Sequence, residues 1–172
     1  MVNLPNKITL LRIALIPLFL IFLYLKIPYR EIIAASIFVI LALSDTLDGY
    51  IARKRKQVTD LGKFIDPLAD KLLVSAALIF LIGQGVEAWM AFVIIAREFV
   101  ITGLRILAAS KKIVIHASNL GKLKTVSQVV GVVAVLINLS IAWWLMLIAV
   151  IFTVISGIDY LMAAKKLLKE SS

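Results

Sequence analysis

Five of the six aspartates in this 172-residue chain fall within one short stretch. Asp45 and Asp48 are spaced i, i+3 and Asp66 and Asp70 i, i+4, so each pair projects from one face of its helix. If the two helices run antiparallel, the four carboxylates converge in one pocket. Oxygen ligands without His or Cys favour Mg²⁺, Mn²⁺ or Ca²⁺, and four carboxylates suffice for two ions arranged for phosphoryl transfer.

The apolar segments beside these aspartates set their depth in a membrane. The uncharged run 32–44 spans roughly 20 Å at about 1.5 Å per residue, short of the ~30 Å hydrocarbon core, so the first pair lies near the boundary. Pro67 suits a first helical turn and starts the next span beside the second pair. Each aspartate at this depth costs on the order of 2.5–3.5 kcal/mol, which a metal ion offsets. The alternative is an interfacial salt-bridge network with Arg53, Lys54, Lys63 and Lys71.

The composition predicts a membrane protein with one helical domain over 1–172. Apolar residues make up 62% of the chain and the mean hydropathy is +1.05, whereas an ordinary soluble domain is roughly 45–50% apolar. A helix needs about 20 residues to cross the hydrocarbon core. We therefore expect an all-α integral membrane protein with six transmembrane helices, in the apolar stretches at about 7–26, 31–52, 66–84, 87–110, 121–140 and 142–164.

The basic residues indicate orientation and partners. Lys and Arg gather on alternate loops, with only Lys26 and Arg30 on the opposite loops, so both termini are expected in the cytoplasm. The net charge of +9 lies between apolar runs, which favours anionic lipids and phosphorylated substrates over nucleic acid. The absence of cysteine excludes disulfides and thiolate catalysis. The first apolar run, 8–25, lacks a small-residue cleavage site and is expected to remain as a span.

The aspartates belong to a longer pattern. It reads Asp45-Thr46-Leu47-Asp48-Gly49-Tyr50-Ile51-Ala52-Arg53, followed at set spacing by Gly62, Asp66 and Asp70. At every fixed position it resembles the motif of the CDP-alcohol phosphatidyltransferase family. A less exacting resemblance, to bacterial members that use glycerol 3-phosphate, covers 3–12, 66–71, 97–105, 121–125 and 156–160. The first of these segments adds Asn6, Thr9 and Arg12 as lesser site candidates.

The resemblance implies that an acceptor hydroxyl attacks the lipid-side phosphorus of CDP-diacylglycerol and that CMP departs. The four aspartates match the metal-binding residues for two Mg²⁺ or Mn²⁺ ions, and Asp70 also matches the proposed general base. The resemblance also implies a homodimer in the bacterial inner (cytoplasmic) membrane, with the active site facing the cytoplasm. The residues expected to bind the CDP-lipid are Thr46, Gly49, Ala52, Arg53 and Gly62.

Charged residues inside the fourth expected span are functional candidates, because charge at membrane depth is costly. Arg97 and Glu98 are adjacent, so we expect them to point to different faces rather than to pair. Arg105 lies two turns beyond Arg97 and, with Lys122 and Lys124, is expected to form a basic pocket for the phosphate of glycerol 3-phosphate. The two lysines fit equally well as positive residues of the cytoplasmic interface.

Other functions remain open. Within the family, the acceptor is alternatively phosphatidylglycerol, an inositol phosphate or serine. Outside it, intramembrane aspartates also suit a divalent-cation transporter, although their clustering on one side argues against a continuous ion path. A noncatalytic assembly protein would leave the buried charges without a use. Asp159 either pairs with Arg12 or faces the pocket, and His116 is expected in a solvated loop.

Overall fold

The computed structural model describes residues 4–54, 60–110 and 119–170, with side chains described for 9–44, 68, 69, 71–108 and 119–165. Within these ranges the chain is all-helical, which confirms the expected fold class. Each expected apolar stretch forms one helix. The helices are α1 (Leu4–Tyr24), α2 (Arg30–Lys54), α3 (Asp60–Phe80), α4 (Ala88–Ser110), α5 (Asn119–Leu136) and α6 (Ala142–Glu170).

The boundary between α5 and α6 has a local chemical cause. The sequence from 125 to 158 carries no charge, yet the chain turns at Asn138, which adopts a left-handed conformation with φ of 54°. The Leu139 amide donates to the Ala134 carbonyl at 2.9 Å, and the Asn138 amide donates to the Val135 carbonyl at 3.0 Å. This pattern closes a helix C-terminus, and asparagine tolerates the left-handed position that it requires.

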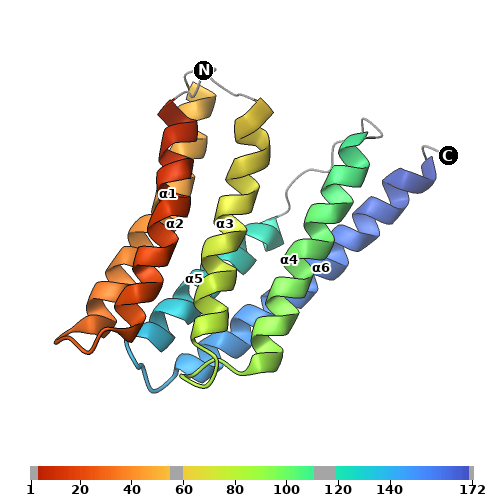
Figure 1. The fold of residues 1–172 in the computed structure, drawn as a ribbon. Helices are drawn as coiled ribbons and strands as arrows, with labels where there is room; N and C mark the ends of the chain where they lie inside the picture. Colours follow the sequence, from red (N-terminus) through yellow and green to blue (C-terminus); the bar gives the residue numbers. More distant parts are fainter. Residues whose placement is uncertain (1–3, 55–59, 111–118, 171–172) are drawn as a thin grey trace.

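The six helices pack as two connected groups (Figure 1). The first group is α1, α2 and α3, each in contact with the other two. In the second group α4 and α5 both pack on α6, while α5 also contacts α2 and α3, and α3 contacts α4. Successive helices run in opposite directions, so the first turn of α1 and the last turn of α6 lie at the same end of the bundle (Figure 1).

Apolar side chains fill the space where these helices meet. Phe19 and Phe38 are fully buried, with ring centroids 5.7 Å apart, and they join α1 to α2. Between α5 and α6, a Cβ on Gly131 would lie 2.8 Å from the Met146 sulfur, so glycine is what allows these helices to approach closely. The core therefore occupies the middle of the bundle and leaves one end to polar residues.

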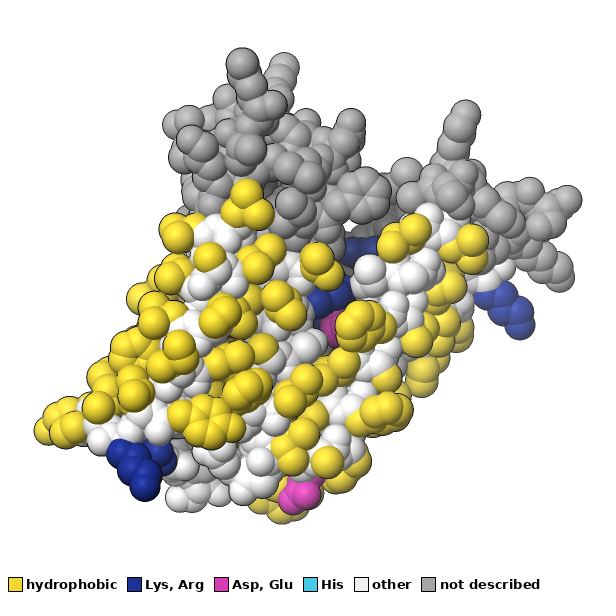
Figure 2. Space-filling model, in the orientation of Figure 1, with side chains coloured by type: hydrophobic (Ala, Val, Ile, Leu, Met, Phe, Trp, Pro, Cys, Tyr) yellow, Lys and Arg dark blue, Asp and Glu magenta, His cyan; other side chains and the backbone are white. Residues whose placement is uncertain are grey.

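On the face of the bundle seen in Figure 2, the described side chains are largely apolar. Phe92 and Phe99 on α4 are 72% and 64% exposed, as expected of side chains that face lipid or a partner. Among the described residues, one segment, Ala142–Lys165, is long and apolar enough to cross a membrane, and Thr9–Tyr24 and Lys71–Phe80 are shorter apolar helices. Charged residues interrupt the apolar sequence of α4 at Arg97, Glu98 and Arg105. The six-span topology and the orientation of the termini stay predictions.

Candidate active site

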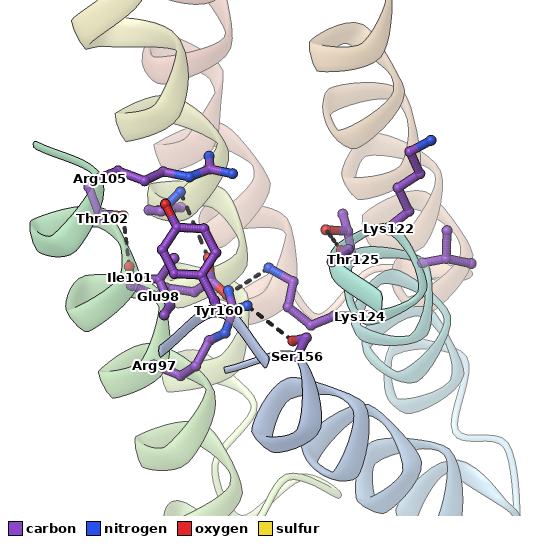
Figure 3. A pocket seen from close by; sticks show the side chains of 13 residues that line it. Arg97, Glu98, Ile101, Thr102, Arg105, Lys122, Lys124, Thr125, Ser156 and Tyr160 are labelled. Carbon is purple, nitrogen blue, oxygen red and sulfur yellow. Dashed lines mark hydrogen bonds and ion pairs between the residues drawn. The ribbon is translucent and has the colours of Figure 1, made fainter. Parts of the chain in front are cut away.

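A polar cavity of about 410 Å³ opens between α3, α4, α5 and α6 (Figure 3). Its described lining contains five cationic side chains and a single carboxylate. Such an excess of positive charge suits a small anionic ligand. The cations are Lys71 of α3, Arg97 and Arg105 of α4, and Lys122 and Lys124 of α5; the carboxylate is Glu98 of α4.

Glu98 is buried and lies at the centre of these charges. Its Oε1 accepts a hydrogen bond from Lys124 Nζ at 2.6 Å and another from Arg97 Nη1 at 3.1 Å. Its Oε2 lies 3.8 Å from Lys71 Nζ. One carboxylate therefore connects α3, α4 and α5, and it holds two of the cavity's cations by charge-assisted hydrogen bonds.

The contact between Arg97 and Glu98 corrects the expectation that these neighbours point apart. Adjacent residues on a helix do start in different directions, but the arginine stem is long enough to carry its guanidinium round to the Glu98 carboxylate. The same guanidinium reaches α6, where Nη2 donates to Ser156 Oγ at 3.0 Å. Arg97 thus holds α4 and α6 together at the base of the cavity.

The three residues predicted to bind the acceptor phosphate all line this cavity, but they differ in how far their side chains are buried. Lys124 is 7% exposed and engaged by Glu98. Arg105 and Lys122 are exposed and come from different helices, and Figure 3 shows them on opposite sides of the cavity. The Arg105 guanidinium lies over the ring of Tyr160, 5.5 Å from its centroid. Arg105 and Lys122 are therefore the cations with side chains open to an entering ligand.

Sequence reasoning missed part of the cavity wall. Ser156 and Tyr160, which are 1% and 6% exposed, line it from α6, and Lys71 lines it from α3. The available signal was the i, i+4 spacing of Ser156 and Tyr160 in an otherwise apolar helix, which places both on one face. Asp159 is half-buried and is not among the residues that line the cavity.

The aspartate motif lies on the neighbouring part of the bundle. Asp45 and Asp48 are in the second half of α2. Asp66 and Asp70 lie between the start and the midpoint of α3, which packs against α2. Their side chains are outside the described residues, and no group of metal-ligating side chains occurs in the part that is described. Also outside it are the side chains of Asn6, Thr46, Gly49, Ala52, Arg53 and Gly62, and the whole of His116.

The residue that precedes this motif is held by α1. Arg12 is 1% exposed, and its Nε donates to Ser44 Oγ at 3.0 Å. Ser44 Oγ in turn donates to the Leu41 carbonyl at 2.8 Å. Thr9, one turn before Arg12, is fully buried. These two N-terminal candidates therefore lie inside the bundle, next to the start of the aspartate motif.

Comparison with known proteins identifies the family. The sequence profile of the CDP-alcohol phosphatidyltransferases matches residues 2–155. The chain belongs to the CDP-alcohol phosphatidyltransferase family. This confirms the family predicted from the aspartate pattern, and it makes the protein a phosphatidyltransferase enzyme.

Relatives within this family match all or nearly all of the chain. The CDP-diacylglycerol–glycerol-3-phosphate 3-phosphatidyltransferase of Bacillus subtilis (strain 168) is 44% identical, over 100% of both chains. Proteins of the same name from Rickettsia bellii (strain RML369-C) and Yersinia enterocolitica (serotype O:8 / biotype 1B) are each 38% identical. The first match covers 95% of this chain and 96% of the relative, and the second covers 98% of each.

Proposed function

We propose that this CDP-alcohol phosphatidyltransferase transfers the phosphatidyl group of CDP-diacylglycerol to glycerol 3-phosphate, giving phosphatidylglycerophosphate and CMP in phospholipid biosynthesis. The names of the full-length relatives support both substrates. The observation that carries the choice of acceptor is the cavity, whose described lining holds five cations and one carboxylate. A phosphate monoester carries close to two negative charges at neutral pH, which this surplus of cations accommodates.

The lining divides the charges into two roles. Glu98 neutralises part of the positive charge and holds Lys124 and Arg97 in place. Arg105 and Lys122, whose side chains are exposed, bind the acceptor phosphate through charge-assisted hydrogen bonds. A serine acceptor has no phosphate group to use these cations. The volume of about 410 Å³ suits a small acceptor such as glycerol 3-phosphate.

The donor half of the reaction is assigned to α2 and α3. Asp45, Asp48, Asp66 and Asp70 would hold two Mg²⁺ or Mn²⁺ ions. The donor set fits hard cations, since it consists of carboxylates on two helices that pack together. When bound, such ions would neutralise the charge that develops on the departing CMP. The residues that bind the CDP-lipid are Thr46, Gly49, Ala52, Arg53 and Gly62.

The chain's own chemistry in this proposal is a proton transfer. The acceptor hydroxyl forms a bond to the lipid-side phosphorus, the bond between that phosphorus and the CMP oxygen breaks, and the Asp70 carboxylate takes the hydroxyl proton. Asp70 directly precedes Lys71, whose side chain lines the cavity. The proposed base is therefore adjacent in sequence to a residue of the proposed acceptor site, which supports this assignment.

The proposed setting is the bacterial inner membrane. Six spans, cytoplasmic termini and an active site that opens to the cytoplasm agree with the basic residues on alternate loops. The exposed apolar side chains of the described helices and the length of Ala142–Lys165 support contact with lipid. We also propose a homodimer, on the resemblance to the family alone.

The deciding experiment varies the acceptor. Purified protein in lipid nanodiscs receives CDP-diacylglycerol and Mg²⁺, and CMP release is measured with glycerol 3-phosphate, serine, inositol phosphate, phosphatidylglycerol or no acceptor. We expect release that requires glycerol 3-phosphate and stops when EDTA is added. Faster release with another acceptor would overturn the substrate assignment. Divalent-cation flux in proteoliposomes without CMP release would overturn the enzyme assignment.

A further inference from the structure

Two arginines of α4 meet one face of α6. Arg97 and Arg105 are eight residues apart, so they lie two turns apart on the same side of α4. Ser156 and Tyr160 lie one turn apart on α6, and both line the cavity. The four side chains form two contacts between the helices, one at the base of the cavity and one nearer its opening (Figure 3).

The contact at the base is closely fitted. Arg97 Nη2 donates to Ser156 Oγ at 3.0 Å. A Cβ at Gly157 would lie 3.2 Å from Arg97 Cγ, which is closer than such atoms ordinarily pack, and in ordinary contact with Arg97 Nε at 3.6 Å. Gly157 therefore leaves the space in which the arginine stem lies. Ser156 and Gly157 of α6 therefore constrain the position of the Arg97 side chain at the base of the cavity.

The contact nearer the opening joins the buried Tyr160 ring to the exposed Arg105 side chain. The Arg105 guanidinium lies 5.5 Å from the Tyr160 ring centroid, within the range of a cation–π interaction. Tyr160 is 6% exposed, whereas Arg105 is exposed. The Tyr160 ring is held in place by the residues that bury it, whereas the exposed Arg105 side chain is free to adopt the position over the ring. Tyr160 is thus a platform that favours one position of the Arg105 head.

The Tyr160 hydroxyl takes no part in the described contact with Arg105. It is buried, and it has no hydrogen-bond partner within the part of the chain that the structure describes. The face of the ring is therefore the part of Tyr160 that acts on Arg105. Substitutions can therefore remove the hydroxyl alone or the whole ring, and their effects can be compared.

We propose that Tyr160 is a positioning residue of the acceptor site, whose ring holds the Arg105 guanidinium over the cavity before the acceptor arrives. The inference rests on the proposed function, in which Arg105 binds the acceptor phosphate. A long side chain that is already ordered loses less conformational freedom when the ligand binds. The ring thereby strengthens acceptor binding without touching the acceptor.

The test compares variants of Tyr160 in steady-state assays that vary each substrate separately. Tyr160→Leu removes the ring and is expected to raise the KM for glycerol 3-phosphate about 2- to 5-fold, with kcat and the KM for CDP-diacylglycerol little changed. Tyr160→Phe keeps the ring and is expected to recover most of this loss. Leu161→Ala, at the next residue, whose side chain is 45% exposed, is the matched control on α6.

Combination with Arg105→Ala decides whether Tyr160 acts through Arg105. If it does, adding Tyr160→Leu to Arg105→Ala raises the KM for glycerol 3-phosphate little further, because the group that the ring positions is already gone. Fully multiplicative effects would overturn the proposal. So would a Tyr160→Phe variant as impaired as Tyr160→Leu, or equal changes in both KM values.

The same variants separate this inference from the proposed function. If Arg105→Ala leaves the KM for glycerol 3-phosphate unchanged, the proposed acceptor site is wrong. If Arg105→Ala raises that KM and Tyr160→Leu does not, the site stands and the positioning role is wrong. Tyr160→Met, a second variant without a ring but with an unbranched side chain, gives the same comparison should Leu impair folding.

Discussion

Lys124 Nζ lies 2.6 Å from Glu98 Oε1, and both side chains are buried between α4 and α5. Arg97 shares the same oxygen, and Lys71 lies 3.8 Å from the other. Three cations therefore lie within ion-pair distance of one carboxylate. Such an arrangement is sensitive to the loss of the Glu98 charge, because the cations around it are largely removed from bulk water.

The first prediction concerns this carboxylate. Glu98→Gln keeps the shape of the side chain but removes the negative charge to which Lys124 and Arg97 donate hydrogen bonds. Removing one partner of a buried ion pair costs on the order of 3 kcal/mol, so the thermal unfolding midpoint in detergent should fall by several degrees. Glu87→Gln, at an exposed residue next to α4, is the control. Equal midpoints for the two variants would show that the Glu98 charge adds nothing to stability.

The second prediction concerns the acceptor phosphate. Arg105→Ala should raise the KM for glycerol 3-phosphate by roughly 10- to 100-fold, as expected for the loss of a charged hydrogen bond, and should change the KM for CDP-diacylglycerol far less. Initial rates with each substrate varied in turn measure both constants. Lys26→Ala, at an exposed residue distant in sequence from the cavity, controls for the loss of a positive charge. Equal changes in both constants would assign Arg105 another role.

The third prediction concerns the metal ligands. Asp45→Asn, Asp48→Asn or Asp66→Asn should abolish transfer while the protein still inserts and folds, because a neutral amide is a weaker metal ligand and costs less within the membrane. CMP release measures transfer, and size-exclusion chromatography in detergent checks the fold. Activity above about a tenth of wild type in two of the three variants would contradict the ligand assignment.

The fourth prediction separates Asp70 from the other aspartates. If Asp70 takes the acceptor proton, Asp70→Asn should lower kcat by roughly 10²- to 10⁴-fold while CDP-diacylglycerol and metal still bind. If Asp70 is only a ligand, metal affinity should fall with the rate. Titration of CDP-diacylglycerol, Mg²⁺ and Mn²⁺ against the variant distinguishes the two. Recovery of turnover by excess metal would rule out the general base.

The positions of the helices were predictable because they follow from local sequence. The length of an uncharged run limits where a helix can begin and end, and Asn138 interrupts the longest of these runs, because asparagine tolerates the left-handed backbone conformation that the turn requires. The family was predictable for a similar reason. The fixed positions of the aspartate motif lie within a single short stretch, so their spacing is read directly.

The contacts inside the cavity were harder to predict because they join distant parts of the chain. Arg97 and Ser156 are 59 residues apart, and no local pattern indicates that one donates to the other. The expectation for Arg97 and Glu98 was wrong because helical geometry fixes where a side chain starts and not how far it reaches. Lys122 and Lys124 are similar in sequence, yet only packing distinguishes the exposed lysine from the buried one.

The partners of the Glu98 carboxylate are synthesised at different times during translation. Glu98 and Arg97 leave the ribosome together on α4, but Lys124 follows only with α5, and Ser156 and Tyr160 only with α6. The aspartate motif is complete well before any of these partners exists. In a nascent chain that ends after α4, Glu98 would have neither its α5 lysine nor an arginine held by α6. The acceptor cavity is therefore the last part of the protein to assemble during translation, and an unfinished chain would carry the aspartates without it.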